Sequence, residues 1–244
     1  MKRGFVRGLW GIYDDRHHFK HRRKLDNDIK LLKHNMYAQP FKAYVFGEDN
    51  YKYLVDQGFD CKLVDKKPIV WDMDKEQFRH KIEIWRCGME DFDEIVHLDW
   101  DTQLIKPLPS DFWEVLEQKA SVQAILRIYH KSKAKKWREV DKRKVCCASW
   151  VYMRDKNIPD ELIAQWEEMG RPWSEEEVLS KYTDGLVGGW KGIEKYWETF
   201  EPPYFTLEGG CKVFDDELLA TKDVCYQHFC PKEVNRILKE LGQQ

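Results

Sequence analysis

One stretch near the middle of the 244-residue chain decides the fold that we expect. It spans residues 94–108 and reads Glu94-Ile95-Val96-His97-Leu98-Asp99-Trp100-Asp101-Thr102-Gln103-Leu104-Ile105-Lys106-Pro107-Leu108. The apolar run over 94–98 is typical of a buried strand, and two carboxylates follow directly after it. Ligands of open α/β sheets bind just outside the carboxyl ends of the strands. We therefore expect Asp99 and Asp101 to lie at a binding site.

Strand and helix patterns alternate on both sides of this stretch. Further strands are expected at 4–13, 42–46, 61–64, 121–129, 146–153 and 224–230. Helices are expected at 25–36, 51–55, 78–89, 110–117, 159–169 and from 174 onward. The alternation over the first 130 residues predicts an α/β fold, with a mixed, mainly parallel sheet flanked by helices. Because no linker rich in proline or glycine divides the chain, we expect a single domain over 1–244.

The composition excludes a disordered chain and gives no support to a polyanion-binding role. Hydrophobic residues make up 42% and aromatic residues 14%, and 41 basic against 43 acidic residues give a net charge of -2. No apolar run approaches the roughly 18–20 residues that span a bilayer, and no signal-type stretch opens the chain. Seven cysteines without a C-x-x-C spacing favour reduced thiols. We therefore expect a cytoplasmic protein with no transmembrane segment and no nucleic-acid partner.

The D-x-D pair predicts a cation site. In an extended chain, positions i and i+2 point the same way, so Asp99 and Asp101 can face one ligand. Two close carboxylates repel each other unless a cation or a proton lies between them. A hard divalent ion shared with substrate phosphates is the natural partner. The alternative is a pair of exposed carboxylates in a turn.

The stretch over residues 93–108 resembles the D-x-D region of GT-A glycosyltransferases, and the helix at 78–89 and the strand at 4–13 precede it in the expected order. The resemblance is clear over about residues 3–130 and loose after them. It implies a GT-A-like (Rossmann-like) fold, a nucleoside-diphosphate sugar donor (usually a UDP-sugar) and Mn²⁺ or Mg²⁺. It also implies a glycan or other hydroxyl acceptor, bound by the half of the domain at 131–244, with the donor bound by 1–130.

The resemblance assigns the metal ligands. In the family the second Asp binds the metal directly, which implies this role for Asp101. The first holds the ribose, or the metal through water, which implies this role for Asp99. Members with this layout often take a third ligand from a late strand, and His228 is the candidate here. The alternative for His228 is a histidine satisfied within the core.

Five further residues are donor-binding candidates. Lys81 lies at the edge of the apolar stripe of its helix, where an ammonium needs an anion such as a diphosphate; the alternative is a side chain that snorkels to water. By resemblance, Trp10, Gly11 and Tyr13 end the first strand where the family binds the base and ribose; core packing is the alternative for Trp10. Ser149 stands where the family shows N-x-G-x, and the Asn and Gly of that pattern are missing.

The candidate catalytic carboxylates come from the second half of the chain. Residues 174–179 form a capping box that opens a helix. Similar transferases place an acidic pair at such a helix start, near the reacting sugar carbon, and Glu176 and Glu177 are the closest matches. Asp184 is a rival candidate for the base. The alternatives are an acidic first turn that stabilises the helix dipole, and a turn at Asp184.

Three other classes of protein compete with the transferase. Haloacid-dehalogenase-like phosphohydrolases also carry D-x-D after an apolar strand, as D-x-D-x-[TV], but Gln103 occupies the fifth position here. A sugar-1-phosphate nucleotidyltransferase needs a basic, glycine-rich loop after the first strand, which residues 8–16 do not provide. A catalytically inactive GT-A domain that binds a sugar nucleotide or a glycan stays open.

Overall fold

The structure is a computed structural model. It describes residues 1–11, 19–68, 79–104, 107–108, 110–118, 121–128, 144–172, 175–184, 205–206, 210–211, 226–228 and 231–243. Only the backbone is described at 19–22, 125–128, 144–147, 183–184, 205–206, 210–211, 226–228 and 231–233.

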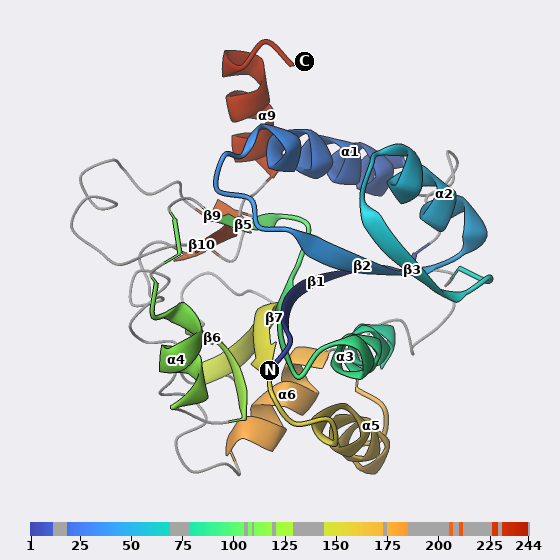
Figure 1. Cartoon of the computed structure of the whole chain (residues 1–244), viewed down its shortest axis with the longest axis vertical. Coiled ribbons are helices and arrows are strands. Elements are labelled where there is room, and N and C mark those ends of the chain that lie inside the picture. Colours follow the sequence, from blue (N-terminus) through green and yellow to red (C-terminus); the bar gives the residue numbers. More distant parts are fainter. Residues whose placement is uncertain are drawn as a thin grey trace.

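A six-stranded mixed sheet forms the centre of the molecule, in the strand order β3-β2-β1-β4-β7-β6 (Figure 1). Its strands are β1 (Arg3–Leu9), β2 (Phe41–Phe46), β3 (Asp60–Asp65), β4 (Glu94–Leu98), β6 (Val122–Ile128) and β7 (Lys144–Met153). The strands β3, β2, β1 and β4 pair in parallel, whereas β7 is antiparallel to both β4 and β6. The predicted α/β fold with a mixed, mainly parallel sheet is confirmed.

Helices cover both faces of the sheet, as Figure 1 shows. The first face carries α1 (Phe19–His34) and α2 (Glu48–Asp56), and the other carries α3 (Arg79–Asp91), α5 (Ile158–Glu168) and α6 (Glu175–Asp184). Alternation along β2 explains the division: Ala43 and Val45 pack in the core with α1, and Tyr44 and Phe46 pack in the core with α3. The sheet is therefore buried on both faces.

Smaller elements extend this frame. The short helix α4 (Phe112–Glu117) packs the ring of Phe112 against the ring of Phe5 in β1, with ring centroids 6.3 Å apart. Two-residue strands β8 (Phe205–Thr206) and β9 (Gly210–Cys211) pair with each other. The strand β5 (Thr102–Leu104) pairs with β10 (Tyr226–His228), and α9 (Pro231–Glu240) packs against α1. The end of the chain thus returns to its first half.

Most predicted elements differ from the observed ones by a few residues at their ends. The first strand ends at Leu9 rather than residue 13, and residues 12–18 lie outside the described part of the chain. The first helix spans Phe19–His34, so Met36 follows it and is 84% exposed. Met36 shares the helical spacing of the apolar stripe, but the helix stops before reaching it. The helix α9 was not predicted.

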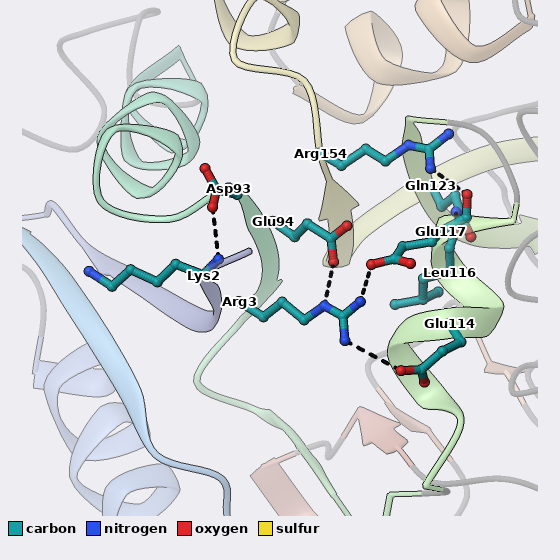
Figure 2. Close-up of polar contacts among 9 residues, drawn as sticks. All are labelled: Lys2, Arg3, Asp93, Glu94, Glu114, Leu116, Glu117, Gln123 and Arg154. Atoms are coloured by element: carbon teal, nitrogen blue, oxygen red, sulfur yellow. Dashed lines mark hydrogen bonds and ion pairs between the residues drawn. The ribbon is translucent and has the colours of Figure 1, made fainter.

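An ion-pair cluster closes the amino end of the central strands (Figure 2). The Arg3 guanidinium lies 3.0 Å from Glu94 Oε2 and 3.5 Å from Glu114 Oε1, and it also contacts Glu117. Burial raises the pKa of Glu94, whereas the hydrogen bond from Arg3 lowers the pKa of Glu117. The cluster joins β1, β4 and α4 at the end of the sheet opposite to the D-x-D segment. We therefore infer that it stabilises the fold and takes no part in the site.

A second charged cluster ties α3 to β2 and β3. The Asp91 carboxylate accepts hydrogen bonds from Lys42 Nζ at 2.8 Å and Tyr44 Oη at 2.9 Å, and Lys62 Nζ lies 3.4 Å away. Desolvation disfavours the charge of Asp91, but the hydrogen bonds from Lys42 and Tyr44 outweigh it and lower its pKa to about 2. The ionised carboxylate is therefore the form that the fold stabilises.

Replacing Asp91 by Asn is expected to lower the free energy of unfolding at pH 7 by about 1–3 kcal/mol, since charged hydrogen bonds are lost. Because the folded-state pKa is depressed to about 2, this contribution is complete above about pH 4 and is lost as the pH falls through the folded pKa. The gap between wild type and Asp91→Asn should therefore narrow between pH 5 and pH 2. Urea denaturation across that range measures it.

The matched control is Glu90→Gln, the exposed neighbour on the same helix, whose carboxylate lies 3.4 Å from Lys62. This variant should change the free energy of unfolding by no more than about 0.5 kcal/mol. A gap that is independent of pH, or an equal loss in Glu90→Gln, would contradict the assignment.

Candidate functional site

The D-x-D segment lies at the point where the strand order reverses. From β1 the chain proceeds through β2 to β3 on one side, and β4 then pairs with β1 on the other side. In open α/β sheets, ligands bind beside the carboxyl ends of the two strands at such a switch point. Asp99 follows the last residue of β4, so this segment occupies that place.

The backbone at Asp99-Trp100-Asp101 is a turn rather than an extended chain. The Thr102 N–H donates to the Asp99 carbonyl at 2.9 Å, and the Asp99 N–H donates to the Ser149 carbonyl of β7 at 2.9 Å. The expectation that both carboxylates follow the alternation of a strand was therefore wrong. The chain must reverse here because β5 leaves the central sheet and pairs with β10.

Two buried groups from β1 fix this turn. Arg7 is 2% exposed, and its guanidinium donates to the Asp99 carbonyl and, at 3.0 Å, to the Thr102 carbonyl. The Trp100 indole N–H donates to the Gly8 carbonyl at 2.8 Å. Arg7 was not among the predicted site residues, although a single arginine within the apolar run at 4–9 was a signal in the sequence.

Lys81 of α3 forms the centre of the site. Its ammonium lies 2.8 and 3.0 Å from the two carboxylate oxygens of Asp99, and 3.1 Å from Glu175 Oε1. Desolvation opposes the charge, but Asp99 and Glu175 outweigh it and raise the pKa of Lys81. The side chain is 5% exposed, so it does not snorkel to water. The sequence predicted an anion beside the Lys81 ammonium, and the carboxylates of Asp99 and Glu175 occupy that place.

Glu175 is the first residue of α6 and was not among the predicted site residues, whereas its neighbours Glu176 and Glu177 were. It is 5% exposed, and desolvation raises its pKa. Its Oε2 atom has no hydrogen-bond partner among the residues that the structure describes. Glu176 accepts a hydrogen bond from the Ala148 N–H at 3.2 Å, whereas Glu177 is exposed. The signal for Glu175 was its helical spacing from the buried Val178 and Leu179.

His97 lies beneath this cluster as a neutral ring. It is fully buried, and desolvation, followed by the charges of Lys81 and Arg7, lowers its pKa well below the ordinary value. Its Nε2 lies 3.8 Å from Asp99 Oδ1, and its ring packs edge-on against Trp85, with centroids 5.8 Å apart. Because His97 is neutral, it does not form an ion pair with Asp99, which pairs with Lys81 instead.

Asp101 pairs with a different lysine. It is 9% exposed, and its Oδ2 contacts Lys24 Nζ of α1. Desolvation opposes the lysine charge, but Asp101 and Asp28 outweigh it and raise the pKa of Lys24. Lys24 and Lys81 come from helices on opposite faces of the sheet, so each carboxylate of the D-x-D turn is held by an ammonium from its own side.

Of the predicted donor-binding residues that follow β1 or belong to β7, Ser149 contacts the D-x-D turn. Ser149 is 2% exposed and accepts the Asp99 N–H through its carbonyl. The Gly11 carbonyl accepts from Asn50 Nδ2 at 2.8 Å. Trp10 packs against the core on the α3 side, and Tyr13 lies outside the described residues.

The two remaining predicted residues are described by their backbone alone. His228 is opposite Thr102 in the β5–β10 pair, so its backbone lies next to the end of the D-x-D turn. Asp184 is the last residue of α6, the helix that Glu175 begins. The structure therefore brings the His228 backbone to the site and tests neither side chain.

The carboxylates fit a hard cation in their chemistry. Asp99 and Asp101 offer the oxygen ligands that Mn²⁺ and Mg²⁺ accept, and ammonium groups already stand where a positive charge is needed. Within the described residues, no three His, Cys, Asp or Glu side chains form a group able to hold a metal. A cation here would therefore need ligands beyond these two carboxylates.

No protein-family model matches the chain, and no curated protein matches it. Solved glycosyltransferase structures are similar to it. GlyE of Streptococcus pneumoniae TIGR4 has a TM-score of 0.45 and 15% identity, over 80% of this chain and 46% of that one. A glycosyltransferase involved in glycosylation of the major capsid of PBCV-1 has a TM-score of 0.45 and 10% identity, over 98% and 99%.

Mouse xyloside xylosyltransferase 1 has a TM-score of 0.43 and 8% identity, over 74% of this chain and 81% of that one. In the part of the chain that the structure describes, no helix is both long and apolar enough to cross a membrane.

Replacing Lys81 by Met is expected to destabilise the fold by about 3–5 kcal/mol, because the buried Glu175 and the half-buried Asp99 lose the cation that they share. Glu175→Gln should cost less, since Asp99 still pairs with Lys81. In the double variant the loss should be smaller than the sum of the single losses, by about 1–3 kcal/mol. Urea denaturation of the four proteins gives this coupling free energy.

Glu177→Gln, on the exposed side of the same helix turn, is the control and should change stability by no more than about 0.5 kcal/mol. Additive losses for Lys81→Met and Glu175→Gln would show that the ammonium does not join the two carboxylates in solution.

Proposed function

We propose that the chain is a GT-A-like glycosyltransferase that transfers a sugar from a nucleoside-diphosphate sugar, with a UDP-sugar as the expected donor, to a hydroxyl acceptor. The observation that carries the proposal is the place of the D-x-D turn at the β1/β4 switch point. Two carboxylates and two ammonium groups converge there, which suits a ligand that joins a diphosphate to a cation.

The end of β1 is proposed to hold the nucleoside. Trp10 offers a ring, and Gly11 allows close approach of the backbone, with Tyr13 next along the chain. Asn50 binds both the Gly11 and the Phe46 carbonyl, at 2.8 and 2.9 Å, and so fixes the ends of β1 and β2 together. This rigid edge would orient the base and ribose toward Asp99.

The D-x-D turn is proposed to hold the diphosphate end of the donor. Asp101 would bind Mn²⁺ or Mg²⁺ directly, Asp99 would bind the ribose or the metal through water, and His228 would be a third ligand. The bound metal supplies positive charge that stabilises the leaving diphosphate. Lys81 would act at the donor site by holding the Asp99 carboxylate in a fixed place before the donor arrives.

The second half of the chain is proposed to bind the acceptor and to carry the reacting carboxylate. Glu177 and Asp184 both belong to α6, and Glu175 anchors the first turn of that helix to Lys81. A carboxylate carried on α6 would therefore keep a fixed place relative to the D-x-D turn. Ser149, beside Asp99 on β7, is proposed to contact the donor sugar.

UDP is expected to raise the melting temperature of the wild-type protein in the presence of Mn²⁺, and to have no effect in excess chelator. Ligands specific for the folded state stabilise by RT ln(1 + [L]/Kd), about 2.7 kcal/mol at a hundredfold excess over Kd. Asp101→Asn should fold and lose this response, because the amide keeps the shape and removes the charge. Thermal melts with and without Mn²⁺ measure both effects.

Asp56→Asn, an exposed carboxylate at the end of α2, is the matched control and should respond as wild type does. Stabilisation by UDP in chelator, or an unchanged response in Asp101→Asn, would contradict the metal bridge. Incubation with a panel of UDP-sugars, with UDP release as the readout, separates an enzyme from an inactive binding domain. Binding of a UDP-sugar without release of UDP, whichever acceptor is added, would favour the inactive domain.

A further inference from the structure

The two lysines of the D-x-D turn differ in how firmly they are held. The Lys81 side chain is 5% exposed and contacts three carboxylate oxygens. The Lys24 side chain is 37% exposed, and within the described residues it forms an ion pair with Asp101 Oδ2. Moving Lys24 into water therefore costs less than moving Lys81, because Lys24 is already partly hydrated.

Asp101 has the opposite character. Its side chain is 12% exposed, so it is more deeply buried than the ammonium that neutralises it. A carboxylate in that environment is costly without a positive partner. Any cation that approaches from the solvent side can take the place of Lys24, because the lysine can leave and the carboxylate cannot. Asp99, by contrast, keeps Lys81 on both oxygens.

We propose that Lys24 is an internal competitor for the metal position: its ammonium occupies Asp101 until a divalent cation displaces it. The inference rests on the proposed metal site and adds a residue to it that the sequence did not suggest. The lysine keeps Asp101 neutralised and in place when no donor is present, and it lowers the affinity of the free protein for a bare cation. Metal binding is then coupled to the movement of α1 residue Lys24 rather than of Lys81.

The size of the effect follows from occupancy. If Asp101 is free of Lys24 for only a fraction of the time, the apparent Kd for the cation is the intrinsic value divided by that fraction. A pair formed nine-tenths of the time would thus weaken metal binding about tenfold. Lys24→Met removes the ammonium and keeps the length of the side chain, so it should bind Mn²⁺ about tenfold more tightly than wild type.

The test is a titration of Mn²⁺ alone, with free Mn²⁺ measured by electron paramagnetic resonance, on the full chain. Lys24→Arg retains the charge and should bind Mn²⁺ as weakly as wild type. Lys30→Met, an exposed lysine of the same helix, controls for the change in net charge and should also match wild type. In the Asp101→Asn background, Lys24→Met should give no gain, because the competition acts on that carboxylate.

The measured Mn²⁺ affinities decide whether Lys24 competes with the metal. A gain in Lys24→Met that disappears with Asp101→Asn supports the inference. Equal Mn²⁺ affinity in wild type and Lys24→Met, or a gain that persists with Asp101→Asn, overturns it and leaves the proposed function intact, provided that wild type binds Mn²⁺ with UDP. Absence of Mn²⁺ binding in both proteins, with and without UDP, overturns the metal-dependent function and the inference together.

Discussion

The Lys81 ammonium is the interaction on which the rest of the site depends. It contacts both oxygens of Asp99 and one oxygen of Glu175, so a single charge joins α3, the end of β4 and the start of α6. An ammonium has three N–H donors, and three carboxylate oxygens lie within reach of them. Because the lysine and Glu175 are both about 5% exposed, breaking either contact would leave a charge in a poorly hydrated interior. The ion pair with Lys81 thus holds the Asp99 carboxylate in place.

The charges of the site are nearly balanced before any ligand binds. Lys81 faces Asp99 and Glu175, and Lys24 faces Asp101 and Asp28. The Arg7 guanidinium binds backbone carbonyls, and the neutral His97 adds no charge. A bare divalent cation would disturb this balance, whereas a cation that arrives with a diphosphate brings compensating negative charge. The pair with Lys24 explains how Asp101 tolerates being only 9% exposed. Lys24, the better hydrated lysine, is the group that can yield.

The sequence predicted those parts of the site that lie within one element. The strand at 94–98 has the predicted bounds, and Lys81 was recognised because an ammonium is out of place beside an apolar helical stripe. Its partner Glu175 was not predictable, since that residue belongs to a helix far away in the sequence. Lys24 gave no local signal, because it stands next to the buried Leu25 at the edge of an ordinary amphipathic helix. The turn was also missed, since an apolar strand followed by D-x-D does not reveal where the chain reverses.

One small residue connects the core to this chemistry. A Cβ atom at Gly8 would lie 2.2 Å from Ile84 Cδ1, so the absence of a side chain lets α3 approach β1 closely. Ile84 stands one helical turn after Lys81, and the depth at which the lysine sits follows from that close approach. The Gly8 carbonyl also accepts the Trp100 indole N–H at 2.8 Å, which anchors the middle of the D-x-D turn. The first strand thereby positions both partners of the ion pair, the lysine through packing and Asp99 through the turn.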